Sequence, residues 1–313
     1  MPLRMTKTDT MDELSLEWAL HVKNYKLNLD RNACVGCQIC SLACPKEAIK
    51  IEKSPKTPGT KIQKAKTDID LSKCNFCGIC DILCPYGAIS VTVDGKHLLS
   101  VLEKESFPQM IRDIKADASK FPMNRWNRED ICPLELITVH FSTNDGRPVE
   151  DPGSLNESER RGLKVNVEVD KKHCPCCGIC EAELPQGAMQ VRRLISGKLA
   201  IKSEKCPPGC TDCLDVCPIT GVLYLSEDDK KVHANEMFCV HCGACKVVCP
   251  VDEALDFKRT RINHAPVRSG TWNKALERLT SPIDMTKELK AKRSLKARET
   301  VKKRLGLKEE QHV

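Results

Sequence analysis

The sequence predicts an α+β fold made of several copies of one small unit. Two observations support this fold class. The 313-residue chain contains 21 cysteines, most of which follow the spacing C-x2-C-x2-C-x3-C-P, and short segments of alternating apolar and polar residues flank the cysteine runs. Alternation with a period of two is typical of half-buried strands. We therefore expect each unit to contain a leading strand, a cysteine loop, a short helix that starts near the third cysteine, and a trailing strand.

The expected strands recur in step with the cysteines, which indicates an internal repeat. Leading strands are expected at residues 26–30, 67–71, 165–169 and 199–202, and trailing strands at residues 48–51, 88–91, 188–191 and 222–225. Two units that face each other would then form one α+β domain.

Three units carry the complete cysteine motif, each with a proline after its fourth cysteine. They are Cys34, Cys37, Cys40 and Cys44; Cys74, Cys77, Cys80 and Cys84; and Cys239, Cys242, Cys245 and Cys249. This spacing resembles that of bacterial-type ferredoxins, in which three cysteines hold one [4Fe–4S] cluster and the fourth binds the sister cluster. The chain is thus expected to carry iron–sulfur clusters and to transfer electrons.

Disulfides and zinc are the other common uses of cysteine. A disulfide framework is typical of short secreted chains with an even cysteine count, whereas this chain is long and its count is odd. Structural zinc is usually bound by two C-x2-C pairs separated by a longer loop. Three cysteines within seven residues, followed by C-P, favour a cluster over both.

A fourth run has the same order of cysteines with one altered gap. It consists of Cys206, Cys210, Cys213 and Cys217, followed by Pro218. Its first gap has one extra residue, which a turn at Pro207, Pro208 and Gly209 could absorb.

The two remaining units, in the middle of the chain, have each lost ligands. One keeps Cys174, Cys177 and Cys180 but has Leu184 at the fourth position; the unit before it keeps only the fourth cysteine, Cys132, with Pro122, Arg125 and Arg128 at the other three positions. Under crossed ligation, the surviving cysteines form one complete site and the lost positions form the other. We therefore expect a module with a single cluster. The alternative is that Cys132 is a lone buried thiol and the Cys174 unit holds a three-cysteine or 3Fe site.

The crossed rule predicts five [4Fe–4S] sites. Their ligands would be Cys34, Cys37, Cys40 and Cys84; Cys74, Cys77, Cys80 and Cys44; Cys174, Cys177, Cys180 and Cys132; Cys206, Cys210, Cys213 and Cys249; and Cys239, Cys242, Cys245 and Cys217. Cys176 is left over, as a spare small side chain or as a competitor of Cys177. The sites form a relay of two, one and two clusters, whose middle module is either a bridge or a branch point.

Six segments follow from this assignment. They are an N-terminal extension (1–25), a two-cluster domain (26–93), a helical spacer with a helix near residues 108–120 (94–121), a one-cluster degenerate domain (122–195), a second two-cluster domain (196–260) and a basic helical C-terminal tail (261–313). Residues 142–162 are expected to form a long polar loop, either a partner contact or a solvated insertion.

The C-terminal tail contains one amphipathic pattern. Trp272, Ala275, Leu276 and Leu279 fall on one helical face. A tryptophan beyond the repeat indicates that something buries it, and the basic run at 287–304 is either a docking arm for an acidic partner or a solvated helix.

Composition and charge narrow the function classes. Six of the seven net positive charges come from residues 285–313, and each ligated cluster would add negative charge, so the charge gives little support for nucleic-acid binding. No secretory signal and no apolar segment of membrane-spanning length are present, which favours a reducing cytoplasm. We find no nucleotide-binding motif and no acid–base pair or nucleophile set, so a non-catalytic protein is expected.

Other residues near the cysteines have supporting roles. His173 and His241 are expected to be outer or surface groups rather than ligands. Glycines inside the cysteine loops, Gly36, Gly78, Gly178 and Gly243, are expected to let backbone N–H groups approach the cluster sulfurs.

At the level of these motifs, the chain resembles archaeal polyferredoxins. Its C-terminal third resembles the polyferredoxin subunit of tungsten or molybdenum formylmethanofuran dehydrogenase, through the segments 206–218, 235–245 and 251–254 and the helix at Trp272. That family typically carries more clusters than the five counted here.

The resemblance implies a cytoplasmic, anaerobic electron relay in methanogenesis or its reverse. The chain would pass low-potential electrons between soluble ferredoxin or another redox protein and the catalytic subunits of a large oxidoreductase complex, with the metal pterin in a partner. A polyferredoxin of a hydrogenase or heterodisulfide reductase, a free soluble electron carrier, and an iron–sulfur regulatory or storage protein are the alternatives.

Overall fold

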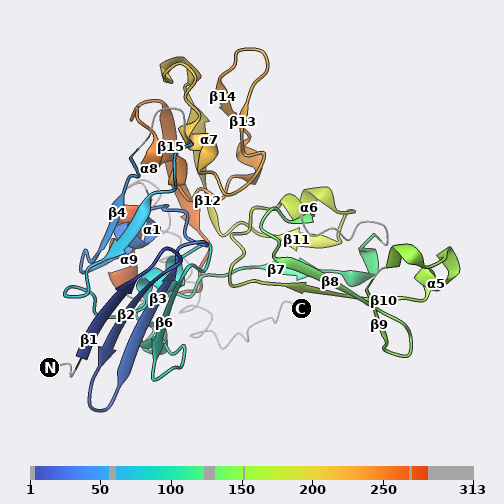
Figure 1. The fold of residues 1–313 in the computed structure, drawn as a ribbon, viewed down its shortest axis with the longest axis horizontal. Coiled ribbons are helices and arrows are strands. Elements are labelled where there is room, and N and C mark those ends of the chain that lie inside the picture. Colours follow the sequence, from blue (N-terminus) through green and yellow to red (C-terminus); the bar gives the residue numbers. More distant parts are fainter. Residues whose placement is uncertain (1–3, 56–60, 123–130, 151, 268–269, 281–313) are drawn as a thin grey trace, which may run out of the picture.

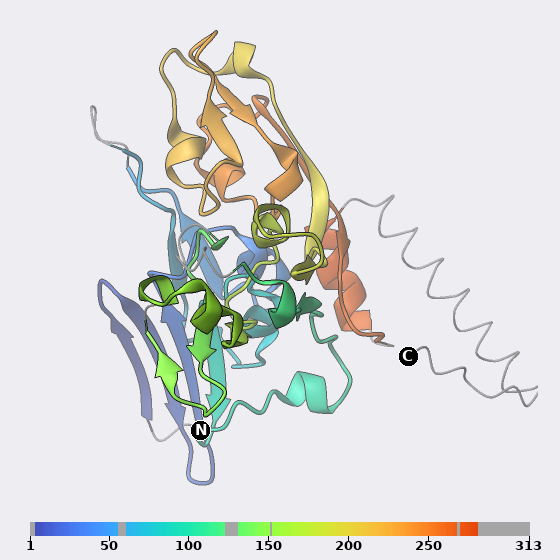
Figure 2. The ribbon, with the colours of Figure 1, turned by 90° about the vertical axis from the view of Figure 1, so that its right-hand side faces the viewer.

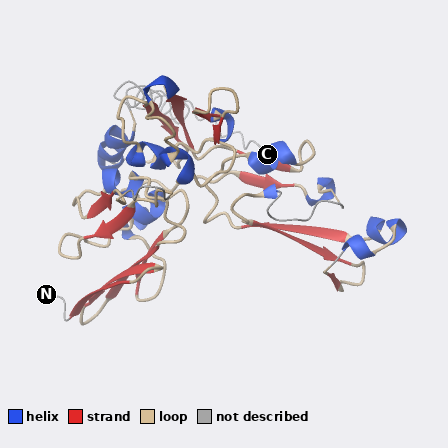
Figure 3. Cartoon of the chain, turned by 45° about the horizontal axis from the view of Figure 1, so that its top comes forward, coloured by secondary structure: helices blue, strands red, loops and turns tan. Residues whose placement is uncertain are grey.

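The described part of the chain is a mixture of short helices and short strands (Figures 1 and 3). The computed structural model describes residues 4–55, 61–122, 131–150, 152–267 and 270–280. The strands are β1 Arg4–Asp9, β2 Glu13–Ala19, β3 Asn24–Asp30, β4 Ile49–Glu52, β5 Lys66–Ile69, β6 Ile89–Val93, β7 Ile114–Ala116, β8 Ile137–Ser142, β9 Pro148–Val149, β10 Lys164–Val169, β11 Met189–Val191, β12 Ile195–Ile201, β13 Leu223–Leu225, β14 Val232–Ala234 and β15 Leu255–Ile262. The α-helices are α1 Ile39–Ala43, α2 Ile79–Leu83, α3 Ser100–Glu103, α5 Glu157–Arg161, α6 Ile179–Glu183, α7 Asp212–Asp215, α8 Ala244–Val248 and α9 Gly270–Leu279.

The same strand pairing recurs in three parts of the molecule. The leading strand of one unit pairs with the trailing strand of the next, and the two inner strands pair with each other. The antiparallel pairs are β3–β6 with β4–β5, β7–β11 with β8–β10, and β12–β15 with β13–β14. All eight expected strands are present, with ends that differ by up to four residues. Because consecutive units pair in this crossed way, their cysteine loops face each other.

The N-terminal segment, expected to be an extension, is a β-hairpin that enlarges the first sheet. β1 pairs with β2 and β2 pairs with β3, which gives the order β1-β2-β3-β6 (Figure 1). Leu14 and Leu16 of β2 are fully buried. The ring of Trp18 lies 5.2 Å from that of Phe76, in the second cysteine loop. The alternating pattern Leu14-Ser15-Leu16 signals a strand, and its burial makes this hairpin part of the first domain.

The helix expected near residues 108–120 is absent, and this prediction is wrong. The segment instead contains β7 and a single 3-10 turn, Ala118–Lys120, capped by Asp117. Within β7, Ile114 pairs with Val191 of β11. Apolar residues at Met110, Ile114 and Ala118 do fit a helical spacing, but pairing with β11 satisfies the backbone of Ile114–Ala116 as a strand instead. It therefore supplies the leading strand of the third unit rather than a helical spacer.

The segment 142–162 is more ordered than the expected polar loop. β9 pairs with the end of β8, and α5 begins at a capping box. The Asn156 side chain accepts a hydrogen bond from the Glu159 N–H at 2.9 Å, and the Glu159 carboxylate accepts one from the Asn156 N–H at 3.0 Å. This Asn-x-x-Glu signal is visible in the sequence. The insertion projects from the middle part of the molecule (Figure 1).

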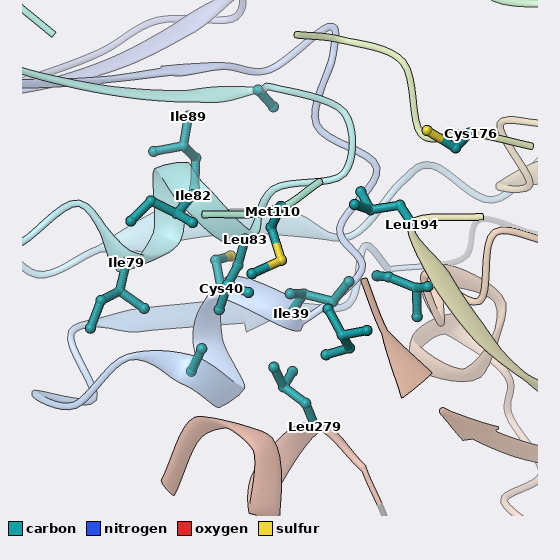
Figure 4. Close-up of a cluster of buried hydrophobic side chains, with 14 of the residues drawn as sticks. Ile39, Cys40, Ile79, Ile82, Leu83, Ile89, Met110, Cys176, Leu194 and Leu279 are labelled. Carbon is teal, nitrogen blue, oxygen red and sulfur yellow. The ribbon is translucent and has the colours of Figure 1, made fainter. Parts of the chain in front are cut away.

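Helix α9 covers the first domain. Trp272, Ala275, Leu276 and Leu279 are buried, as their helical spacing predicts. The helix packs against α1, with Leu279 directed toward Ile39 and Cys40 (Figure 4). The Trp272 ring meets Phe107 edge-on at 5.2 Å. The chain itself therefore buries this tryptophan, which is no longer an argument for a partner. The basic run 287–304 lies outside the described residues.

Candidate metal centres

Four of the five cysteine loops are shaped by left-handed residues on both sides of the second cysteine, whereas the loop that starts at Cys206 has only Gly209 before it. Before the second cysteine of these four loops, Gly36, Phe76, Cys176 and His241 have φ between 50° and 66°; after it, Gln38, Gly78, Gly178 and Gly243 have φ between 64° and 89°. These residues precede α1, α2, α6 and α8, so each helix begins directly after the loop. The left-handed turns reverse the chain so that cysteines three residues apart line one cavity.

The structure brings together the cysteines of each crossed quartet. Four separate cavities are lined by Cys34, Cys37, Cys40 and Cys84; by Cys44, Cys74, Cys77 and Cys80; by Cys132, Cys174, Cys177 and Cys180; and by Cys217, Cys239, Cys242 and Cys245. In each cavity, three cysteines come from one unit and one from its partner unit. Apolar side chains and the motif prolines form most of the remaining walls.

The fifth quartet is identified by its electrostatics. Burial raises the pKa of Cys206 and of Cys213, and Cys210 and Cys249 raise both values further because the sulfurs are near each other. Cys206, Cys210 and Cys213 come from one unit, and Cys249 comes from the next.

The donor sets fit iron–sulfur clusters better than single metal ions. Within the described residues, no group of three or more His, Cys, Asp or Glu side chains is close enough to hold one ion. Zinc draws its sulfur ligands to about 2.3 Å from a single centre. The sulfurs line the walls of a shared cavity, as they would around a multi-iron cluster.

Burial raises the pKa of many of the free thiols. It raises the pKa of Cys74 and of Cys239 to about 11, and those of Cys180, Cys213 and Cys217 to about 12. Iron binds the thiolate, so cluster assembly must release protons and is opposed by acid.

Several donors are directed at the cysteine sulfurs. The backbone N–H groups of Ala48, Ala88 and His241 donate to Cys44, Cys84 and Cys239 at 3.3–3.4 Å. The hydroxyl of Thr67, on β5, lies 3.3 Å from the Cys34 sulfur. Such bonds stabilise the more negative, reduced state of a cluster. The loop glycines contribute the left-handed turns, and are not the donors in these three bonds.

The middle quartet has one lost partner site and one spare cysteine. Leu184, at the fourth-cysteine position, is buried in the apolar core, and Arg125 and Arg128 lie outside the described residues. Cys176 is buried but does not line the cavity, whereas Cys177 does. Cys176 instead hydrogen-bonds Cys174, which lowers the pKa of Cys174 to about 7. Cys177 is therefore the better placed ligand candidate.

The two histidines do not line the cavities. The His173 ring lies 2.6 Å from the Asp170 carboxylate and is partly exposed. His241 is buried, and burial lowers its pKa. Both positions agree with supporting roles. No helix of the described residues is long and apolar enough to cross a membrane.

Comparison with known proteins finds a family match in the first domain and in the third part of the repeat. A family model described as a 4Fe-4S dicluster domain matches residues 33–88 and 205–253. A ferredoxin of Methanothermococcus thermolithotrophicus is 36% identical over 55 residues, which are 17% of this chain and 88% of that protein. The middle part of the chain is not included in the family match.

Longer relatives are subunits of hydrogen-metabolising enzymes. Formate hydrogenlyase subunit 2 of Escherichia coli K12 is 28% identical over 113 residues, which cover 34% of this chain and 54% of that protein. Hydrogenase-4 component A of the same strain is 32% identical over 85 residues, covering 25% and 40%. This chain therefore spans about half of the length of these relatives, or less.

One solved structure is similar over most of the chain. It belongs to the formate dehydrogenase–heterodisulfide reductase–formylmethanofuran dehydrogenase complex of Methanospirillum hungatei. The match has a TM-score of 0.72 and 27% identity, and it covers 90% of this chain and 92% of that one.

Proposed function

Because this chain belongs to the ferredoxin family of 4Fe-4S dicluster proteins, we propose that it is a polyferredoxin with five [4Fe–4S] clusters in three modules. Five crossed cysteine quartets carry this proposal. Bound clusters would supply reversible one-electron chemistry. The chain's own residues hold the iron through thiolates, exclude water with apolar walls, and donate N–H groups to sulfur.

The proposed task is to relay low-potential electrons to or from the catalytic subunits of formylmethanofuran dehydrogenase, as the polyferredoxin subunit of that enzyme. The similarity over about nine-tenths of both chains to a subunit of a complex containing formylmethanofuran dehydrogenase supports this choice. The chain would be a non-catalytic, cytoplasmic subunit, whose cysteine quartets serve to carry electrons.

A polyferredoxin of a hydrogenase or heterodisulfide reductase complex is the second candidate. The sequence matches to formate hydrogenlyase subunit 2 and hydrogenase-4 component A favour it. The complex in the solved structure also contains heterodisulfide reductase.

Anaerobic purification of the native protein separates these candidates. We expect co-elution with molybdopterin- or tungstopterin-containing subunits, and about twenty irons per chain from four irons in each of five clusters. Co-elution with a nickel-containing subunit would support the second candidate, and a monomer would exclude both in favour of a free carrier.

A further inference from the structure

The loop Cys84–Gly87, in the first domain, touches all three parts of the repeat. It follows α2 and supplies Cys84 to the quartet Cys34, Cys37, Cys40 and Cys84, here called the junction quartet. Figures 1 and 2 show the first domain next to both the β12–β15 part and the β7–β11 part. The contacts of this loop therefore show which quartets are neighbours.

Tyr86 links the junction quartet to the third part of the repeat. It is only 5% exposed and belongs to an apolar cluster with Val35 and the buried cysteines of the third part. Its hydroxyl oxygen is buried and has no hydrogen-bond partner in this structure. Tyr86 lines the junction cavity together with Cys37 and shares its apolar cluster with Cys242. Burial raises the pKa of Tyr86, and Cys242 and Cys37 raise it further. Tyr86 thus lies between Cys37 of the junction quartet and Cys242 of the quartet formed with Cys217.

Arg259, on β15, supports the same contact. It is buried and donates to the backbone carbonyl of His241 at 3.0 Å and to that of Cys242. Both Cys37 and Cys242 interact electrostatically with its guanidinium. One buried cation therefore faces a cysteine from each of two quartets.

Arg112 links the junction quartet to the middle part. Its guanidinium donates to the carbonyl of Cys84 at 2.7 Å and to that of Cys174 at 3.1 Å. A Cβ at Gly87 would lie 2.7 Å from the Lys172 carbonyl oxygen, so the loop also packs directly on the chain before Cys174. Cys177 shares the apolar cluster that contains Tyr86.

The junction quartet also has a neighbour within its own domain. Cys40 lies on α1 and Cys80, in the second quartet of the first domain, lies on α2, and these two helices pack against each other. The junction quartet therefore adjoins three others: the Cys80 quartet, the middle quartet and the Cys242 quartet.

We propose that the junction quartet is the branch point of the relay, and that Tyr86 and Arg112 are the positioning residues that connect it to the third and middle parts. Electrons then pass between the middle part and the third part through the first domain, although the middle and third parts follow each other directly in the sequence. Each transfer moves one electron from one quartet's cluster to the next, with no bond made or broken and no proton transferred. This inference depends on the proposed function in one respect, because it requires [4Fe–4S] clusters at the quartets.

The Tyr86 hydroxyl has a defined role in this arrangement. With a cluster held by Cys242, the buried hydroxyl donates to that sulfur and stabilises the reduced cluster. Hydrogen bonds to charged groups are stronger than those between neutral groups. Removing the hydroxyl should therefore make one cluster harder to reduce and leave the others unchanged.

A redox titration followed by EPR tests this role. We expect Tyr86→Phe to lower the reduced-to-oxidised ratio of one cluster about tenfold at a fixed potential, which is ~59 mV for a one-electron couple. Tyr224→Phe is the matched control, because Tyr224 is 47% exposed on β13 and lines none of the cavities. An unchanged titration of Tyr86→Phe, or an equal shift in Tyr224→Phe, would overturn the role of Tyr86.

Spin coupling between reduced clusters tests the branch point. Replacing Cys34 and Cys40 by alanine removes the junction cluster, and should change the relaxation of the EPR signals of the middle cluster and the Cys242 cluster. Replacing Cys206 and Cys210, at the opposite end of the third part, should leave the middle signal unchanged. A middle signal that is insensitive to the first replacement, or sensitive to the second, contradicts the branch.

Iron content separates a failure of the branch from a failure of the proposed function. Full iron with unaltered coupling rejects the branch alone, whereas iron-free native protein rejects the relay. If the double alanine variant does not fold, Arg112→Gln is measured instead. It should weaken the relaxation effect between the junction and middle clusters while iron stays at the wild-type level, and unchanged relaxation would reject the branch.

Discussion

The first domain and the middle part have the same strand pairing but different numbers of cysteine quartets. In the first domain, β3–β6 and β4–β5 enclose two quartets; in the middle part, β7–β11 and β8–β10 enclose one. At the fourth-cysteine position, Cys84 of the first domain corresponds to Leu184 in the middle part, whereas Cys44 corresponds to Cys132. The pairing therefore persists where ligands are lost, because apolar packing replaces one cluster.

The largest expected effect is a loss of iron, which we expect for Cys132→Ser but not for Cys176→Ser. Cys132→Ser should remove the middle cluster, lowering iron from about twenty to about sixteen per chain, since Cys132 is the only cysteine that the third unit supplies. Cys176→Ser is the matched control, because Cys176 does not line the cavity. Iron quantitation with EPR measures both. Equal iron in Cys132→Ser and wild type would show that the middle cluster does not need Cys132.

The next largest effect tests helix α9, which packs against α1 of the first domain. Trp272→Ala should lower the free energy of unfolding by about 3–5 kcal/mol, because a fully buried tryptophan would leave a cavity beside Phe107. Denaturant unfolding monitored by cluster absorbance measures this. A change below about 1 kcal/mol would indicate that α9 does not hold its place on α1 in solution.

A smaller effect is expected from the residue that fills the lost site. Leu184→Ala should cost about 2–5 kcal/mol through a cavity in the middle part, with iron content unchanged. Leu98→Ala is a control, because Leu98 is half-exposed. The same unfolding measurement applies. Loss of iron in Leu184→Ala would mean that this position supports the remaining cluster directly.

The smallest effect concerns a single hydroxyl in the first domain. Thr67→Val should make the junction cluster harder to reduce, by a factor of several, because it removes a neutral hydrogen bond to Cys34 worth about 0.5–1.5 kcal/mol. Potentiometric titration measures the shift. An unchanged potential would show that Thr67 directs its hydroxyl elsewhere once iron is bound.

Local patterns correctly predicted the strands and the amphipathic helix. The alternation in Lys26-Leu27-Asn28-Leu29-Asp30 predicts β3, and the spacing from Trp272 to Leu279 predicts the buried face of α9. The helix expected at 108–120 failed because Ile114 has its strand partner, Val191, far along the chain, which no local pattern reveals. The N-terminal hairpin was missed for the same reason, since its place depends on the edge of β3.

The cysteine quartets follow from the amino-acid sequence without any structure, because crossed ligation depends only on spacing and on which unit has lost which cysteine. The amino-acid sequence also predicts that Leu184 stands where a ligand cysteine is lost, and that Cys132 is the one remaining ligand of its unit. Which quartets are neighbours, in contrast, emerges from the fold alone. Tyr86, Arg112 and Arg259 make contacts between parts that are distant in sequence. Such contacts depend on how whole domains pack, and domain packing is set by the fit of their surfaces rather than by any local repeat.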